Sequence, residues 1–98
     1  MMTDIFLTMR NNNKEVYYDT NIDFYLPNTS EIVLVRACPD FRRIFKQIID
    51  IEEFLFTHKI TQVTVISLNK MGHIEHPLSK ITIISLNVWK ETVTNNKT

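Results

Sequence analysis

The segment that most constrains the fold is residues 39–58, where apolar residues recur with the period of an α-helix. On a helical wheel the apolar side chains share one continuous arc, and most charged and amide side chains fill the rest. The arc comprises Phe41, Ile44, Phe45, Ile48, Ile49, Ile51, Leu55 and Phe56. A helix of this kind must cover another apolar surface, and β-like runs lie on both sides of it in the sequence. We therefore expect one long helix packed on a sheet.

Two residues interrupt this helical pattern, because Glu52 lies within the apolar arc and Phe54 lies on the polar side. Three interpretations are open. The helix kinks or ends near Asp50 and continues in a new phase, or Glu52 forms hydrogen bonds beneath the rim of the sheet. Alternatively, Glu52 is a desolvated carboxylate with a raised pKa and Phe54 is an exposed anchor for a partner. At the helix start, Pro39 suits the first helical position and Asp40 in the first turn complements the helix dipole.

The other apolar runs have the alternation or the β-branched composition of strands. They are residues 4–10, 15–19, 21–26, 31–37, 61–69 and 80–89, with a short extra strand at 73–76. We expect 15–19 to pair back on 4–10 as a hairpin. The 31–37 run is apolar on both faces, which is typical of a central strand. Because the helix joins 31–37 to 61–69, those two strands should be parallel.

The order β-β-β-α-β-β predicts an α+β fold: a mainly antiparallel sheet of five to six strands with one long helix packed on one face. The opposite face of the sheet is expected to be exposed. Residues 64–69 (TVISLN) and 82–87 (TIISLN) are nearly identical. We interpret this match as similar strand composition rather than as a duplicated unit.

The composition predicts a single domain spanning residues 1–98, with a polar tail at 91–98 that frays. Eleven basic and eleven acidic residues cancel, so no overall field recruits nucleic acid or a membrane. One cysteine, Cys38, makes no internal disulfide and fits a small buried position at a strand–helix junction. Nothing resembles a secretory signal or a spanning helix, so a cytoplasmic protein is expected.

The sequence carries no specific signature of catalysis, and we predict no catalytic residue, no metal, no cofactor and no enzymatic activity. His73 and His76 are separated like ligands on a helix, but a strand would point them to opposite faces. A structural zinc site also needs four protein ligands. The chain has one glycine, which counts against loops that bind phosphates through the backbone.

Two binding functions remain as predictions. The first is a protein-binding module that acts through the exposed sheet face or an edge strand at 80–89, as a homodimer or on a host protein. Its candidate contact residues are Tyr17, Tyr25, Phe54 and Trp89. Small size, compositional bias and missing chemistry suggest a virus- or mobile-element-encoded modulator or inhibitor.

The alternative is a single-stranded nucleic-acid-binding module. It would combine strand tyrosines, on which bases stack, with the densest basic group of the chain. That group comprises Arg36, Arg42, Arg43 and Lys46.

Overall fold

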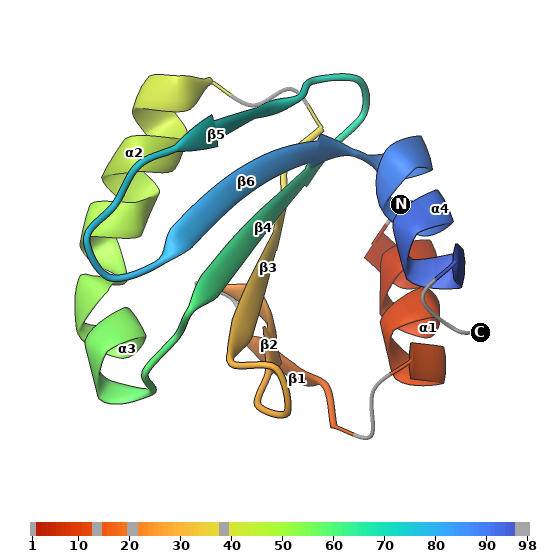
Figure 1. Ribbon diagram of the computed structural model, residues 1–98, viewed down its shortest axis with the longest axis horizontal. Coiled ribbons are helices and arrows are strands. Elements are labelled where there is room, and N and C mark those ends of the chain that lie inside the picture. Colours follow the sequence, from red (N-terminus) through yellow and green to blue (C-terminus); the bar gives the residue numbers. More distant parts are fainter. Residues whose placement is uncertain (1, 13–14, 20–21, 38–39, 96–98) are drawn as a thin grey trace.

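The protein is built around a six-stranded mixed sheet with helices on both sides (Figure 1). The structure is a computed structural model and describes residues 2–12, 15–19, 22–37 and 40–95. In sheet order the strands are β1 (Tyr17–Asp19), β2 (Asp23–Leu26), β3 (Glu31–Val35), β4 (Gln62–Ser67), β6 (Lys80–Ser85) and β5 (Gly72–Ile74). The helices are α1 (Met2–Asn12), α2 (Phe41–Asp50), α3 (Glu52–Thr57) and α4 (Leu86–Asn95). The α+β class is therefore confirmed.

The centre of the sheet is parallel and its two edges are antiparallel. β3 pairs with β4 in parallel, as the crossover through the helix predicts, and β4 pairs with β6 in parallel. β1 pairs with β2, and β2 with β3, in antiparallel hairpins. β5, which corresponds to the short extra strand expected at 73–76, pairs antiparallel with β6 at the other edge. The predicted pairing of 15–19 with 4–10 is wrong, because β1 pairs with β2 instead.

The predicted helix is divided into α2 and α3 by Ile51, which has φ −107° and ψ 11°. This confirms the interpretation that the helix breaks near Asp50. Asp40 precedes α2 as its N-cap, and its carboxylate accepts a hydrogen bond from the backbone N–H of Arg42 at 2.8 Å. Asp40 is thus outside the first turn in which it was expected. Pro39 and Cys38 lie outside the described residues.

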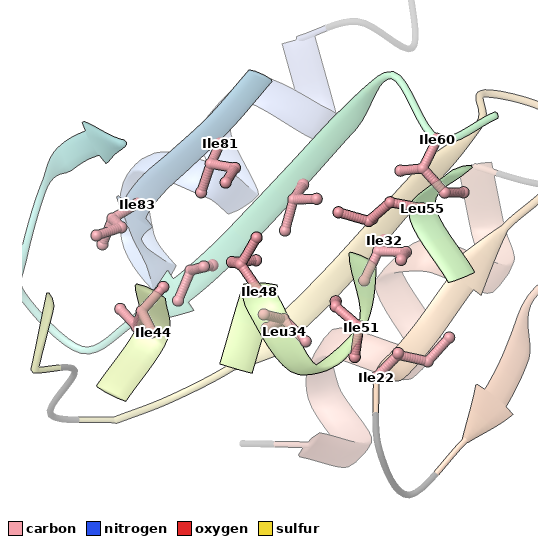
Figure 2. Close-up of a cluster of buried hydrophobic side chains, with 12 residues drawn as sticks. Ile22, Ile32, Leu34, Ile44, Ile48, Ile51, Leu55, Ile60, Ile81 and Ile83 are labelled. Carbon is pink, nitrogen blue, oxygen red and sulfur yellow. The ribbon is translucent and has the colours of Figure 1, made fainter. Parts of the chain in front are cut away.

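Burial of α2 and α3 against the sheet forms the larger of two cores (Figure 2). Ile44, Ile48, Ile51 and Leu55 point from the helices toward the strands. The strands meet them with alternate residues of one face, namely Ile32, Leu34, Val63, Val65, Ile81 and Ile83. The helical period places one set of apolar side chains on the inner side of α2 and α3, and the strand period places another on the facing side of the sheet. The two sets pack together as one aliphatic layer.

The opposite face of the sheet is also covered, by α1 and α4 (Figure 1). The expectation of an exposed face is wrong, and so is the predicted strand at 4–10. Ile5 and Met9 are buried one helical turn apart, whereas Leu7 between them is exposed. The ring of Phe6 stacks on Phe24 of β2 at 5.9 Å. A short apolar run fits either period, and here the need to cover the sheet selects the helix.

The last predicted strand, 80–89, ends at Ser85, and residues 91–95 of the expected tail belong to α4. The Ser85 hydroxyl accepts a 3.4 Å hydrogen bond from the backbone N–H of Val88, as an N-cap does. Trp89 consequently lies on α4, is 7% exposed and packs in the second core. β6 has β4 on one side and β5 on the other, so it is no edge strand.

The two similar hexamers lie side by side and in register. Thr64 is paired with Thr82, and Ser67 with Ser85, across the parallel β4–β6 ladder. After the two serines the structures differ, because the first Ser-Leu-Asn enters a loop and the second begins α4. In both, the serine hydroxyl accepts a hydrogen bond from the backbone N–H three residues later, at 2.9 Å in the case of Lys70.

Replacement of Trp89 by alanine tests the second core. We expect Trp89→Ala to lower the free energy of unfolding by about 3–5 kcal/mol, as for other large buried aromatic residues. Val88→Ala, at an exposed position of the same helix, should change it by less than about 0.5 kcal/mol. Urea denaturation monitored by circular dichroism measures both. Equal, small effects would contradict the burial of Trp89 beneath the sheet.

Candidate functional site

Three of the four predicted partner-binding residues come together at one edge of the sheet. Tyr17 of edge strand β1 is in register with Tyr25 of β2, and their ring centroids are 6.2 Å apart. Tyr25 meets Phe54 of α3 edge to face at 5.4 Å. Phe54 in turn stacks on His58 at 3.9 Å. The result is a continuous aromatic row from the exposed edge of the sheet to the end of α3.

The fourth predicted residue, Trp89, is separated from this row by the sheet. The row packs on the side of α2 and α3, whereas Trp89 belongs to the core beneath α1 and α4. Its assignment as an exposed edge contact is wrong, because α4 begins at Leu86, three residues earlier. Phe54 is half-buried between its two aromatic neighbours, so it is a wall of the row rather than a freely exposed anchor.

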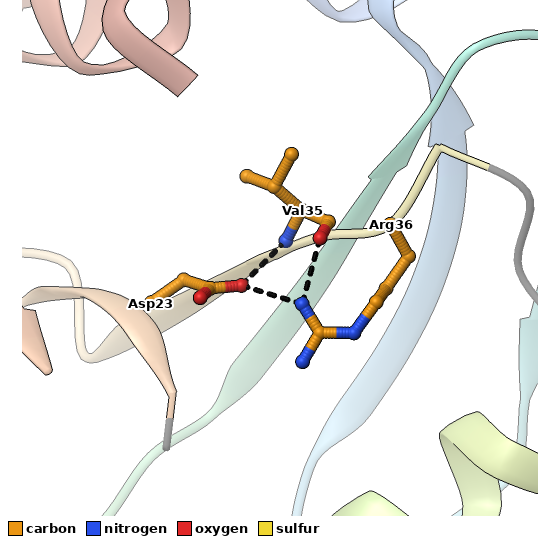
Figure 3. A network of polar contacts seen from close by, with 3 residues as sticks. All are labelled: Asp23, Val35 and Arg36. Atoms are coloured by element: carbon orange, nitrogen blue, oxygen red, sulfur yellow. Dashed lines mark hydrogen bonds and ion pairs between the residues drawn. The ribbon is translucent and has the colours of Figure 1, made fainter. Parts of the chain in front are cut away.

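The basic residues proposed for nucleic-acid binding have two different environments. Arg36 donates from its guanidinium to the Asp23 carboxylate and to the Val35 carbonyl, both at 2.7 Å (Figure 3). The same Asp23 oxygen accepts from the backbone N–H of Val35 at 2.9 Å. Arg36 therefore stabilises the end of β3. Arg42, Arg43 and Lys46 are exposed on α2, where no tyrosine accompanies them.

Glu52, whose position in the apolar arc was ambiguous, joins α3 to the loop after β5. Its carboxylate accepts from Nε2 of His76 at 3.1 Å, and the backbone N–H of Leu78 donates to Nδ1 of the same ring at 3.2 Å. The Glu52 side chain is 47% exposed, so the hypothesis of a desolvated carboxylate is wrong. His76 is nearly buried, whereas His73 is exposed in β5. Among the described residues, no three His, Cys, Asp or Glu side chains form a group that could hold a metal ion.

Glu31, at the start of β3, has a carboxyl group whose pKa is shifted by its surroundings. Burial raises its pKa, and a hydrogen bond donated by the Thr64 hydroxyl at 2.6 Å opposes that shift. A raised pKa can mark a functional acid. The Thr64 hydroxyl belongs to the neighbouring parallel strand, so the Glu31 carboxyl joins β3 to β4, and we assign it a structural role.

The outer side of the helices carries an apolar surface that was not predicted from the sequence. Eleven large apolar side chains are exposed among the described residues, and seven belong to α2, α3 or the loops flanking β5. The seven are Phe41, Phe45, Ile49 and Phe56 on the helices, and Leu68, Met71 and Leu78 in the loops. The wheel had placed the four helical residues in the core. The available signal was the width of the apolar arc, which exceeds what one flat sheet can cover.

This apolar surface borders the other edge of the sheet. The Phe41 ring lies against Gly72, where an added Cβ would come within 3.3 Å of it. Phe45 and Ile49 continue from Phe41 at successive helical turns. Figure 1 shows β5 running beside α2. We call the row Phe41, Phe45, Ile49 and Phe56, together with edge strand β5, the α2–β5 surface.

Comparison of the chain with protein-family models, with curated proteins and with solved structures gave no significant match. None of the described helices has the length and apolar character needed to cross a bilayer. The surfaces themselves are therefore the basis for a functional proposal.

Replacement of Glu31 by glutamine tests the buried carboxyl. A pKa raised above the ordinary 4.5 means that the folded state binds the proton more tightly, so stability falls as pH rises through this pKa. The glutamine side chain carries no charge, and its carbonyl oxygen can still accept from Thr64. We expect Glu31→Gln to raise the melting temperature more at about pH 7 than at about pH 4. Glu15→Gln, an exposed control, should not. A lower melting temperature at both pH values would contradict the burial argument.

Proposed function

We propose that this protein functions by binding another protein through the α2–β5 surface. The observation that carries the proposal is the concentration of exposed apolar side chains along α2, α3 and the loops beside β5. Single exposed apolar residues are ordinary in soluble domains, but a row of them beside a sheet edge is typical of an interaction site.

The geometry of the row suits a partner that packs along the helices. Phe45 and Ile49 are each 48% exposed, and Phe56 is 74% exposed. Large aromatic side chains of this kind contribute much of the binding energy when a partner removes them from water. Because α2 and α3 are held by the core beneath them, the row is presented without prior rearrangement.

Strand β5 offers a second mode of contact at the same surface. It is the last strand of the sheet and, within the described part of the chain, pairs with β6 alone, so its outer side presents backbone groups to a partner. Addition of a strand there would extend the sheet and bring side chains of the partner over Phe41. The bond between Glu52 and His76 holds the loop after β5 against α3, which keeps the two parts of the surface together.

The charge beside the row indicates what kind of partner fits. Arg42 and Lys46 are exposed on α2 next to Phe45 and Ile49. Glu52, at the start of α3, is engaged by His76. A partner with apolar residues flanked by acidic ones would complement this arrangement. Arg42, Arg43 and Lys46 then serve as the rim of a protein interface rather than as a phosphate-binding site.

A protein that binds in this way can alter the activity of its partner by covering part of the partner's surface. We therefore retain the hypothesis of a modulator or inhibitor of a host protein, encoded by a virus or mobile element, which rests on size and composition alone. A cytoplasmic partner is part of the same proposal, as is the alternative that the partner is a second copy of this chain.

A charge placed in the row tests the proposal. Phe45→Asp should abolish capture of a specific protein from a cell lysate, because burial of the aspartate in the interface is costly. Leu7→Asp is the matched control: Leu7 is 55% exposed, on α1 across the sheet, and the variant should capture the same protein. Both variants must first show unchanged circular dichroism. Capture by Phe45→Asp at the wild-type level would contradict the proposal.

Light scattering on the same proteins addresses a second copy as the partner. If the wild type has twice the mass of the 11.6 kDa chain and Phe45→Asp has the single mass, the occupant is another copy. A dimer that persists in Phe45→Asp would place self-association elsewhere.

A further inference from the structure

A groove opens at the opposite edge of the molecule, between the helices and the β1–β2 hairpin. It has a volume of about 720 Å³, and the buried side chains of Ile22 and Ile51 form its floor. Phe54 and His58 form one wall, at the end of the aromatic row. The apolar residues Phe41, Phe45 and Phe56 of the α2–β5 surface do not line it, so the two surfaces are separate.

The rim of this groove is acidic. Asp50 at the end of α2, Glu53 in α3 and Asp19 in β1 line it from two sides. Among the described side chains that line it, none is a lysine or an arginine. Asp19 has an interaction partner of its own, so Asp50 and Glu53 supply the negative charge offered to a ligand, although the whole chain has no net charge. The groove therefore favours a cation over a phosphate or a carboxylate.

The aromatic wall formed by Phe54 and His58 favours a ligand of planar shape. The Phe54 and His58 rings are nearly parallel, with an interplanar angle of 16°. Nδ1 of His58 lies 3.3 Å from the Phe54 carbonyl, which can only accept, so Nδ1 carries the proton in the neutral ring. Nε2 is then an acceptor. Because the two rings stack on each other at 3.9 Å, a planar cation can lie only against the outer face of one of them, where its N–H groups can reach acceptors around its edge.

We propose that this groove binds a guanidinium group, as carried by an arginine side chain. Guanidinium is planar, stacks on aromatic rings and has five N–H donors directed outward in its plane. It can thus contact the wall and donate to Asp50 and Glu53 at the same time. An ammonium group is compact and strongly hydrated, and it would use the carboxylates without the wall. The site goes beyond the proposed α2–β5 interface and does not depend on it.

Titration of the isotope-labelled protein with N-acetyl-arginine methylamide, followed by NMR, tests the assignment. We expect saturable shifts of the amide signals of α3 and of the β1–β2 hairpin, with a millimolar dissociation constant. The citrulline analogue has nearly the same shape without the charge and should bind at least about tenfold more weakly, as expected when a charged hydrogen-bonding partner is lost. Equal shifts from both compounds would overturn the proposal.

Variants separate the contributions of charge and stacking. The double variant Asp50→Asn/Glu53→Gln should weaken binding by about tenfold or more, since both charged acceptors are removed. Phe54→Leu retains the carboxylates and should lower the preference for arginine over lysine methylamide. Glu91→Gln, on α4 across the sheet, is the control and should bind as the wild type does. Unchanged binding by the double variant would overturn the site.

A second ligand tests whether the guanidinium group comes from a polypeptide or from a small molecule. A short peptide with one arginine between glycines should bind more tightly than the methylamide if the groove accepts a polypeptide segment. Equal affinity would show that the groove takes the group alone and would overturn the assignment to a polypeptide. Phe45→Asp should give the same titration as the wild type, so failure of the α2–β5 interface and failure of this groove are distinguishable.

Discussion

The structure depends on the burial of a parallel strand pair on both of its faces. β3 and β4 pair in parallel, and Ile32 and Val63 face one side while Val33 and Ile66 face the other. Strands of this kind cannot leave a face in water without exposing a row of aliphatic side chains. One helical layer is therefore insufficient, and the chain supplies a second from its two ends.

This constraint determines where a partner can bind. Among the described residues both faces of the sheet are covered, so the proposed binding surfaces lie at the two edges and on the outer sides of the helices. The edges have different character. β5 lies beside an apolar row with exposed cations such as Lys46, whereas β1 lies beside an aromatic row and carboxylates such as Glu53. A chain without net charge thus carries two surfaces of different chemistry.

The candidate sites were predictable only in part. Tyr17 and Tyr25 were selected as outward-facing residues of predicted strands and Phe54 as an aromatic residue on the polar side of the helix, and the strand register and a ring contact join them into one row. Trp89 was selected as an outward residue at the end of the last predicted strand and is buried, because its segment is helical. Phe45 shows the opposite error, because it was predicted to be in the core and is exposed. A helical wheel shows that a residue lies near the core side, but the breadth of the covered arc depends on the flatness of the opposing sheet.

A helix break near Asp50 was one of three open interpretations, and the sequence by itself determined the central helix, the central strand 31–37 and its parallel pairing with 61–69. Each follows from local periodicity or from chain connectivity. Only the tertiary structure decided the helices at the two ends. The clearest case is Ser-Leu-Asn, which enters a loop at 67–69 and begins α4 at 85–87. Both serines form the same initial turn, so local chemistry does not distinguish them. The second continues as a helix because Trp89 gains burial against an otherwise open sheet face.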